Sequence, residues 1–214
     1  KRNLLESSKV GYLLVTALGG LFIGFGIVIL VVIGGLLDPA GVPSMKIIQG
    51  LAFGIALCMV TIGGADLFTG NNLIMTIGVL EKKTSWLDLV KVWGYSYGGN
   101  FVGSFLCAIF FVLAGLATGT TGDYIEKIAV VKTSASFTEL LFRGILCNTL
   151  VCLAVWCTYK LKSDSAKIAI IFCCIFPFIL GGFEHSIANM MLFSVTALIP
   201  QGAAFTMGDF IHNL

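Results

Sequence analysis

The most informative segment of the chain reads Gly181-Gly182-Phe183-Glu184-His185-Ser186-Ile187-Ala188-Asn189. It places a carboxylate, an imidazole and an amide in the middle of an apolar run from Ile168 to Pro200. Burying such a group without a polar partner costs about 2–7 kcal/mol, so each group must have a hydrogen-bond or ion-pair partner in the protein or must bind a substrate. Ionisable residues at membrane depth are usually functional, and the segment therefore predicts a functional site.

The same pattern occurs once more, 118 residues earlier (position 63 against position 181), as Gly63-Gly64-Ala65-Asp66-Leu67-Phe68-Thr69-Gly70-Asn71. Both segments follow Gly-Gly-x-acid-x-x-x-small-Asn. Matched polar interruptions in two hydrophobic segments are typical of internally duplicated membrane transporters and channels.

Composition places the chain in a membrane. Of its 214 residues, 57% are hydrophobic and 11% charged, and the apolar blocks are too long for core elements of a soluble domain. The length allows a single transmembrane channel domain over residues 1–214, built from five or six helices. The net charge of +2 comes from basic residues scattered in short loops, which excludes a nucleic-acid partner.

The seven cysteines lie in apolar stretches without a CxxC pair, so we interpret them as hydrophobic filler and expect no metal and no cofactor. Small-xxx-small pairs such as Gly20/Gly24, Gly94/Gly98 and Gly99/Gly103 indicate close helix packing.

Hydropathy and turn residues predict five spans separated by loops, with a polar connection from Thr118 to Ser136. The second span is expected as two half-helices that share one crossing. The predicted spans are Tyr12 to Leu37, Met45 to Gly63 continued by Leu73 to Leu80, Leu89 to Ala117, Phe137 to Tyr159, and a fifth from about Lys167.

The basic residues also predict an orientation. Nine lie on the side of the N-terminus and of the loops after spans two and four, and four lie on the other side. The positive-inside rule then places the N-terminus in the cytoplasm. Spans one to three and four to six then have opposite topology, as an inverted repeat requires.

The repeat is expected to cover residues 10–120 and, incompletely, residues 135–214. The counterpart of the third span would begin near residue 207, so we expect the sixth helix to be missing from this sequence. A natural five-span protein is the alternative, but it would leave half of the repeat unpacked.

His185 is the strongest candidate for a residue that acts on the substrate, because the only other histidine, His212, lies in a polar segment. An imidazole can exchange a proton near neutral pH or donate a hydrogen bond to an anion. A structural histidine that caps a broken helix is the alternative. At membrane depth and beside Glu184, we favour the functional role.

The acids shared by both segments, Asp66 and Glu184, are interpreted as structural braces. A broken helix exposes unpaired N–H groups, and a carboxylate near the start of the next half-helix can accept hydrogen bonds from them. Asn71 and Asn189 are expected to brace the breaks in the same way through their amides.

The segment Leu67-Phe68-Thr69-Gly70 is predicted to be a non-helical loop at membrane depth, which requires that it lines a cavity or is buried in protein. Thr69 is then a pore-facing donor opposite His185. Half-helix N-termini pointing at the membrane centre favour anions.

Asn148, inside the fourth span, could reach this central site or bridge two helices. Lys132, just outside the membrane on the extracytoplasmic side, would concentrate anions at a pore mouth.

At these positions the chain resembles the formate/nitrite transporter family, whose members carry small monovalent anions such as formate, nitrite and hydrosulfide. The resemblance covers essentially the whole chain. The matching segments are Ala65 to Asn72, Phe183 to Met190, Arg143 to Cys152 and Gly208 to Leu214.

The resemblance implies an all-α, aquaporin-like six-helix protomer with its own pore, in the lipid bilayer, assembled as a homopentamer. It places the pore loop (Leu67, Phe68 and Thr69) and His185 at the centre, and it matches Lys132 and Asn148 to the family's vestibule lysine and pore asparagine. Two apolar constrictions would be formed by Phe53, Leu57 and Phe178 on the outer side and by Leu67 and Val151 on the inner side. The chain departs from the family in the missing sixth helix and at Thr149, where an aromatic residue is common.

An anion that crosses apolar constrictions loses its hydration at a high cost, whereas its neutral conjugate acid loses far less. We therefore hypothesise that Lys132 and the half-helix dipoles draw the anion in. His185, near Thr69 and Asn148, would then supply a proton or tune the site.

Two other functions agree less well with the sequence. A neutral-solute pore of the aquaporin type predicts Asn-Pro motifs at both breaks, and the chain contains no Asn-Pro pair. An intramembrane enzyme is disfavoured because Glu184-His185 is not part of an HExxH zinc site and no serine has a base partner. A purely structural scaffold does not explain two matched polar breaks.

Overall fold

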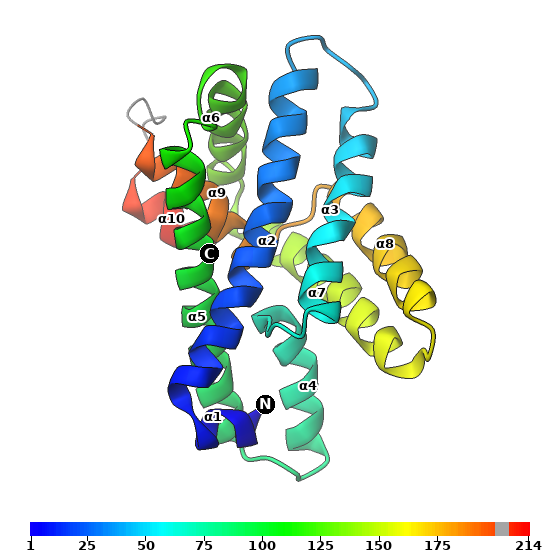
Figure 1. Ribbon diagram of the computed structural model, residues 1–214. Helices are drawn as coiled ribbons and strands as arrows, with labels where there is room; N and C mark the ends of the chain where they lie inside the picture. The colour runs from blue at the N-terminus through cyan, green and yellow to red at the C-terminus, as the bar shows by residue number, and fades with distance from the viewer. Residues whose placement is uncertain (200–205) are drawn as a thin grey trace.

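A computed structural model describes residues 1–199 and 206–214, and its elements are helices throughout (Figure 1). Pro200, the predicted end of the second apolar run, lies outside the described residues. The helices are α1 (Arg2–Ser7), α2 (Lys9–Leu37), α3 (Met45–Ile62), α4 (Phe68–Leu80), α5 (Trp86–Leu113), α6 (Gly119–Thr133), α7 (Phe137–Lys160), α8 (Asp164–Leu180), α9 (Ser186–Leu198) and α10 (Met207–Asn213).

Four of these helices, α2, α3, α5 and α7, are long and apolar enough to cross a membrane. The shorter α4 and α9 are also apolar, with 13 residues each. This pattern confirms the predicted all-α membrane fold with full spans and half-helices. Helix α10 begins at Met207, the position predicted for the start of the sixth span.

Both predicted breaks are present (Figure 1). α3 ends at Ile62 and α4 begins at Phe68; α8 ends at Leu180 and α9 begins at Ser186. The second glycine of each pair makes the turn, with φ of +72° at Gly64 and +67° at Gly182. Residues with a Cβ rarely adopt this left-handed conformation, which explains the glycine at both positions.

The predicted non-helical loop from Leu67 to Gly70 is wrong. Only Leu67, the N-cap, lies outside α4, and Gly70 is helical. The half-helix therefore begins at Phe68 and not near Leu73. It starts early because the Asn100 side chain of α5 accepts a hydrogen bond from the Phe68 N–H at 2.8 Å, which satisfies a backbone donor that the membrane could not.

The connection between spans three and four, predicted as polar chain, contains the helix α6. One face of α6 is buried, including Ile125 and Ala129 at helical i, i+4 spacing, and it packs against α2. The Gln49 amide donates to the Tyr124 hydroxyl at 3.0 Å. Hydropathy missed α6 because the polar half of this amphipathic helix lowers the average.

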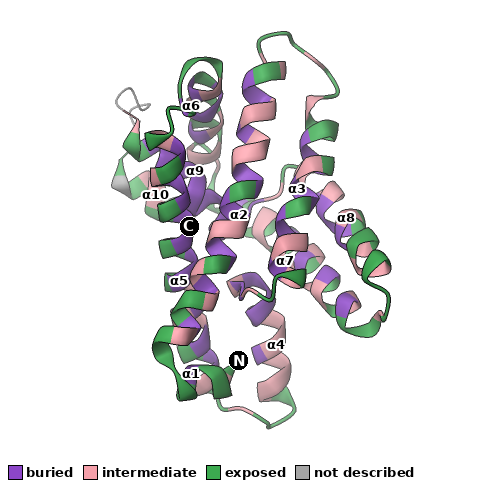
Figure 2. Cartoon of the chain, in the orientation of Figure 1, coloured by how far each residue is buried: buried purple, intermediate pink, exposed green. Residues whose placement is uncertain are grey.

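The closest helix packing is between α2 and α5. A Cβ on Gly103 would collide with the backbone of Ala17, so glycine is what allows the two helices to approach. In contrast, Gly94 and Gly98 have no described atom near the place of a Cβ, so they make no close helix contact within this chain. Figure 2 shows α9 almost entirely buried, and every residue from Ile187 to Thr196 is buried.

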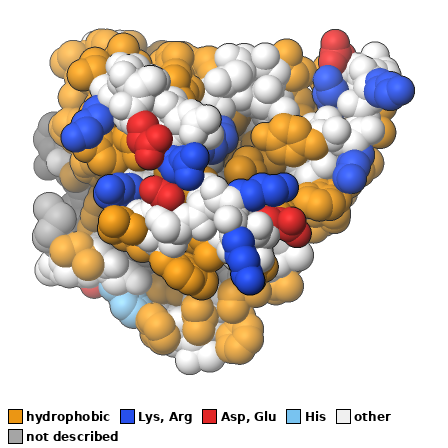
Figure 3. Space-filling view, turned by 90° about the horizontal axis from the view of Figure 1, so that it is seen from below, with side chains coloured by type: hydrophobic (Ala, Val, Ile, Leu, Met, Phe, Trp, Pro, Cys, Tyr) orange, Lys and Arg blue, Asp and Glu red, His pale blue; other side chains and the backbone are white. Residues whose placement is uncertain are grey.

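Charged side chains gather at the end of the molecule that carries α1 and the turn between α4 and α5. Viewed from this end, lysine and arginine side chains surround a few acidic ones on a surface of mixed hydrophobic and uncharged groups (Figure 3). Three ion pairs tie this end together, Lys1 to Asp66, Arg2 to Glu6 and Arg2 to Asp88.

Candidate functional site

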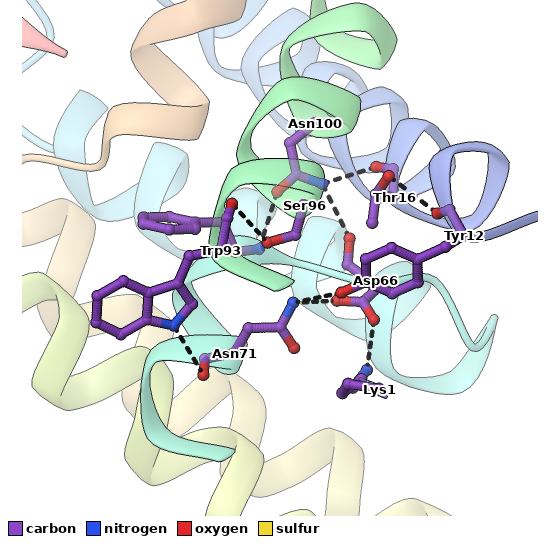
Figure 4. A network of polar contacts seen from close by, with 9 residues as sticks. Lys1, Tyr12, Thr16, Asp66, Asn71, Trp93, Ser96 and Asn100 are labelled. Atoms are coloured by element: carbon purple, nitrogen blue, oxygen red, sulfur yellow. Dashed lines mark hydrogen bonds and ion pairs between the residues drawn. The ribbon is translucent and has the colours of Figure 1, made fainter. Parts of the chain in front are cut away.

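The first break is held by a buried network around Asp66 (Figure 4). Its carboxylate accepts from Lys1 Nζ at 2.8 Å and from the amide of Asn71. The same amide donates to the Tyr12 hydroxyl at 3.2 Å. Asp66 and Asn71 are each 1% exposed, so these contacts supply the polar partners that burial requires.

The second break has a matching network around Glu184. Its carboxylate accepts from Lys132 Nζ and from Asn189 Nδ2, both at 2.7 Å. Asn189 Nδ2 also donates to Asn213, whose own amide donates to the carbonyl of Lys132 at 2.8 Å. Each break therefore joins a lysine, an acid and the asparagine five residues after the acid.

The partners of the two acids differ from the prediction, which paired them with backbone N–H groups of the next half-helix. Lysine and asparagine side chains take that place. Lys1 and Asn213 were not identified from the sequence, and only the analogy between the two breaks could have suggested a lysine for Asp66. Lys132 was predicted as a cation at a pore mouth, and its charge is paired with Glu184.

The two half-helices begin differently. At α9, the N-cap residue His185 accepts the Ala188 N–H at its own Nδ1, at 3.1 Å. At α4, the N-cap residue Leu67 has no side chain that could do so. Asn100 from α5 does this work instead and also donates to the carbonyls of Thr16 at 2.7 Å and Asp66 at 2.9 Å.

The cap defines the chemical state of His185. A backbone N–H can only donate, so Nδ1 must be unprotonated, and the neutral ring carries its proton on Nε2. His185 is 4% exposed, and its ring lies 5.9 Å from that of Phe178. The buried imidazole therefore presents Nε2–H as a hydrogen-bond donor.

A cavity of about 340 Å³ brings the predicted central residues Thr69, Asn148 and His185 together. Thr69 is 5% exposed, and its hydroxyl has no hydrogen-bond partner among the described residues. An unpaired buried hydroxyl is costly unless something in the cavity binds it. We call this space the His185 cavity; it is lined by Phe68, Thr69, Asn72, Leu140, Leu141, Gly144, Ile145, Cys147, Asn148, Glu184, His185, Ser186, Asn213 and Leu214.

A second cavity, of about 190 Å³, is lined by Leu57, Leu67 and Asn71 among others, and we call it the Leu67 cavity. The start of α4 contributes to both spaces. Leu67, Gly70 and Asn71 line the Leu67 cavity, whereas Phe68, Thr69 and Asn72 line the His185 cavity. The first turn of α4 therefore lies between the two cavities and contributes residues to each of them.

The residues predicted to form constrictions all belong to one buried cluster. Phe53 and Phe178 meet edge to face with ring centroids 5.9 Å apart, and both are 2% exposed. Leu57, Leu67 and Val151 are buried in the same cluster. Within residues 1–199 and 206–214, no three His, Cys, Asp or Glu side chains form a group that could hold a metal ion.

A sequence model of the family described as formate/nitrite transporter matches residues 2–214. The nitrite transporter NirC of Salmonella typhimurium is 36% identical over 215 residues, which cover 99% of this chain and 78% of NirC. A probable formate transporter of Methanothermobacter thermautotrophicus is 33% identical, covering 99% of this chain and 84% of that protein.

Solved structures give the same result. A structure described as an FNT family ion channel is 34% identical and matches with a TM-score of 0.93, covering all of this chain and 84% of that one. A pentameric formate channel with formate bound is 28% identical and matches with a TM-score of 0.79, covering 94% of this chain and 86% of that one.

Proposed function

The chain belongs to the formate/nitrite transporter family, and on that premise we propose that it forms a membrane pore for small monovalent anions such as formate, nitrite or hydrosulfide. The names of its relatives support this class of substrate. We further propose a homopentamer with one pore in each protomer, by analogy with the pentameric formate channel. Its place would be a bacterial inner membrane, with the N-terminus in the cytoplasm.

The observation that carries this proposal is the set of unused hydrogen-bond donors in the His185 cavity. The Thr69 hydroxyl has no hydrogen-bond partner among the described residues, and the cap of α9 uses only Nδ1 of His185, which leaves Nε2–H available to the cavity. The N-terminal ends of α4 and α9 lie at this cavity, since Phe68, Thr69 and Ser186 line it. Helix N-termini carry partial positive charge, so the cavity favours an anion.

The lysine, acid and asparagine at each break act in this proposal as braces. In each network the acid is paired with a lysine at 2.7–2.8 Å, so neither break brings a net charge to the pore. Lys132 retains 25% exposure of its side chain and can still contribute to anion attraction from the outer side.

His185 acts as a neutral donor that holds the substrate. A proton on Nδ1 would compete with the Ala188 N–H for the same lone pair, which opposes a charged imidazolium. The proton that neutralises the anion therefore comes from water on the side of origin and leaves with the acid on the other side. The buried aromatic and aliphatic constrictions then pass the neutral acid at much lower cost than the anion.

The test is flux in proteoliposomes. Formate, nitrite, hydrosulfide and chloride would be compared across pH for the wild type and for His185→Asn. Asparagine is a preferred N-cap residue, so this variant keeps a cap for α9 while it removes Nε2–H. We expect the flux of His185→Asn to fall by about tenfold, because one hydrogen bond to the substrate is lost, while flux still rises as pH falls because the proton comes from water. Unchanged flux would refute the role of His185. Flux no higher than in protein-free liposomes would refute the function itself.

A further inference from the structure

The His185 cavity contains one polar residue that the proposed mechanism does not use, namely Asn72. It lies one turn after Thr69 on α4 and lines the same cavity. Its Oδ1 is buried and has no hydrogen-bond partner among the described residues. Its Nδ2 faces Asn148 Oδ1 across the cavity at 3.5 Å, the outer limit of a hydrogen bond.

The two amides therefore join the two halves of the chain at the cavity, α4 from the first half and α7 from the second. The contact between them uses the donor of Asn72 and an acceptor of Asn148. This arrangement leaves the Asn72 oxygen as an unpaired acceptor in a residue that lines the same cavity as Thr69, whose hydroxyl is also unpaired. A buried acceptor without a partner is unfavourable unless a donor reaches it.

Resting on the proposed function, we infer that Asn72 is a specificity-determining residue of the pore, whose Oδ1 accepts a hydrogen bond from the O–H of the neutral acid form of the substrate. The formate and nitrite anions have no acidic hydrogen to give to this oxygen and are repelled by its partial negative charge. The neutral acid has one donor and one acceptor, and it fits between the Asn72 oxygen and the donors Thr69 and His185.

Several titratable groups share this region and must be separated from Asn72 in any test. Besides His185 they include the ion pair of Glu184 and Lys132 at the second break and the thiols of α7. The thiols are those of Cys147 and Cys152. Further from the cavity, the titratable groups that face α4 are Tyr97 on α5 and, at the first break, Tyr12, Asp66 and Lys1. Asn72 has no proton of its own to titrate, so replacing it changes the pH profile only through the substrate.

The test is the pH profile of formate flux in proteoliposomes for the wild type, for Asn72→Leu, which has nearly the same shape without the oxygen, and for Asn72→Ala in case the first variant does not fold. The fraction of neutral acid rises as pH falls. Loss of its acceptor should therefore move the pH of half-maximal flux downward by about 0.5–1 unit, since one ordinary hydrogen bond corresponds to a change of about three- to tenfold.

Thr76→Val is the matched control, because Thr76 lies one turn further along α4 and lines neither cavity. It should leave the profile in place. If the Asn72 variants lower the flux equally at every pH, or leave it unchanged, the inference is overturned while the proposed function stands. If the wild type carries no formate, nitrite or hydrosulfide, the proposed function fails and the inference falls with it.

Discussion

The two breaks use the same brace but begin their half-helices in opposite ways. At both, an acid lies between a lysine and the asparagine five residues further on. At both, the backbone N–H of the acid donates to the first long span of its own half, from Asp66 to Val15 at 3.1 Å and from Glu184 to Arg143 at 3.4 Å. The difference begins at the next residue, Leu67 in one and His185 in the other.

This difference shows how one backbone problem permits two side-chain functions. At the second break, His185 caps α9 with one ring nitrogen and offers the other to the cavity. At the first break, Asn100 supplies the cap from outside, so the N-cap position can hold an apolar leucine. Leu67 is then free to line the neighbouring cavity.

The largest expected effect is on stability, and it comes from replacing Asn100, the external cap that only the first break uses. Asn100→Leu would leave the Phe68 N–H and the Asp66 carbonyl without their side-chain partner and would remove a further bond to the Thr16 carbonyl. We expect the free energy of unfolding in detergent to fall by about 3–5 kcal/mol. Asn3→Leu, at an exposed position of α1, is the control. A loss below about 1 kcal/mol would show that α4 does not depend on this external cap.

The second-largest loss of stability is expected when the acid of either brace is neutralised, and the two losses should be similar. Asp66→Asn and Glu184→Gln each leave a lysine without its counter-charge, which we expect to cost about 2–3 kcal/mol. This is less than for a fully buried pair, because the side chains of Lys1 and Lys132 are 27% and 25% exposed. Thermal unfolding of both variants side by side measures the difference. Losses that differ by more than about 2 kcal/mol would contradict the equivalence of the two breaks.

A smaller effect separates the two roles of His185. His185→Ala removes the cap as well as the donor, whereas His185→Asn keeps a capping oxygen. The alanine variant should therefore be less stable than the asparagine variant by about 1 kcal/mol, although both lose the same transport property. Equal stability of the two would mean that the ring does not cap α9.

The smallest effect on stability is expected at Thr69. Its hydroxyl has no described partner, so Thr69→Val removes no internal hydrogen bond and should change the unfolding free energy by less than about 0.5 kcal/mol. Formate flux should nevertheless fall, by about tenfold if one hydrogen bond to the substrate is lost. A variant with normal flux would remove Thr69 from the transport site.

The sequence was sufficient to predict the broken spans, because the signal is local. Two polar interruptions with glycine pairs are visible without any knowledge of tertiary contacts, and Gly64 and Gly182 make the turns. The polar residues at membrane depth predict that Thr69 and His185 share one site within reach of Asn148, the resemblance implies the same, and all three line one cavity.

What the sequence could not predict depends on partners far away in the chain. Asn100 lies 32 residues from the N–H that it caps, and nothing in the composition of α5 indicates this role. The start of α4 was misplaced for the same reason. Asn213 and Lys1 are likewise recognisable only after the helices are packed. The helix α6 was missed because its buried stripe faces α2 and not lipid.

The shared turn of α4 limits how these segments can change over evolutionary time. Consecutive helical residues point about 100° apart, so an insertion of one residue between Asp66 and Asn71 would rotate every later side chain by that angle. Thr69 and Asn72 would leave the His185 cavity, and Asn71 would lose its acid. Such segments tolerate substitutions but not insertions or deletions, which accounts for two nine-residue patterns that still align without a gap.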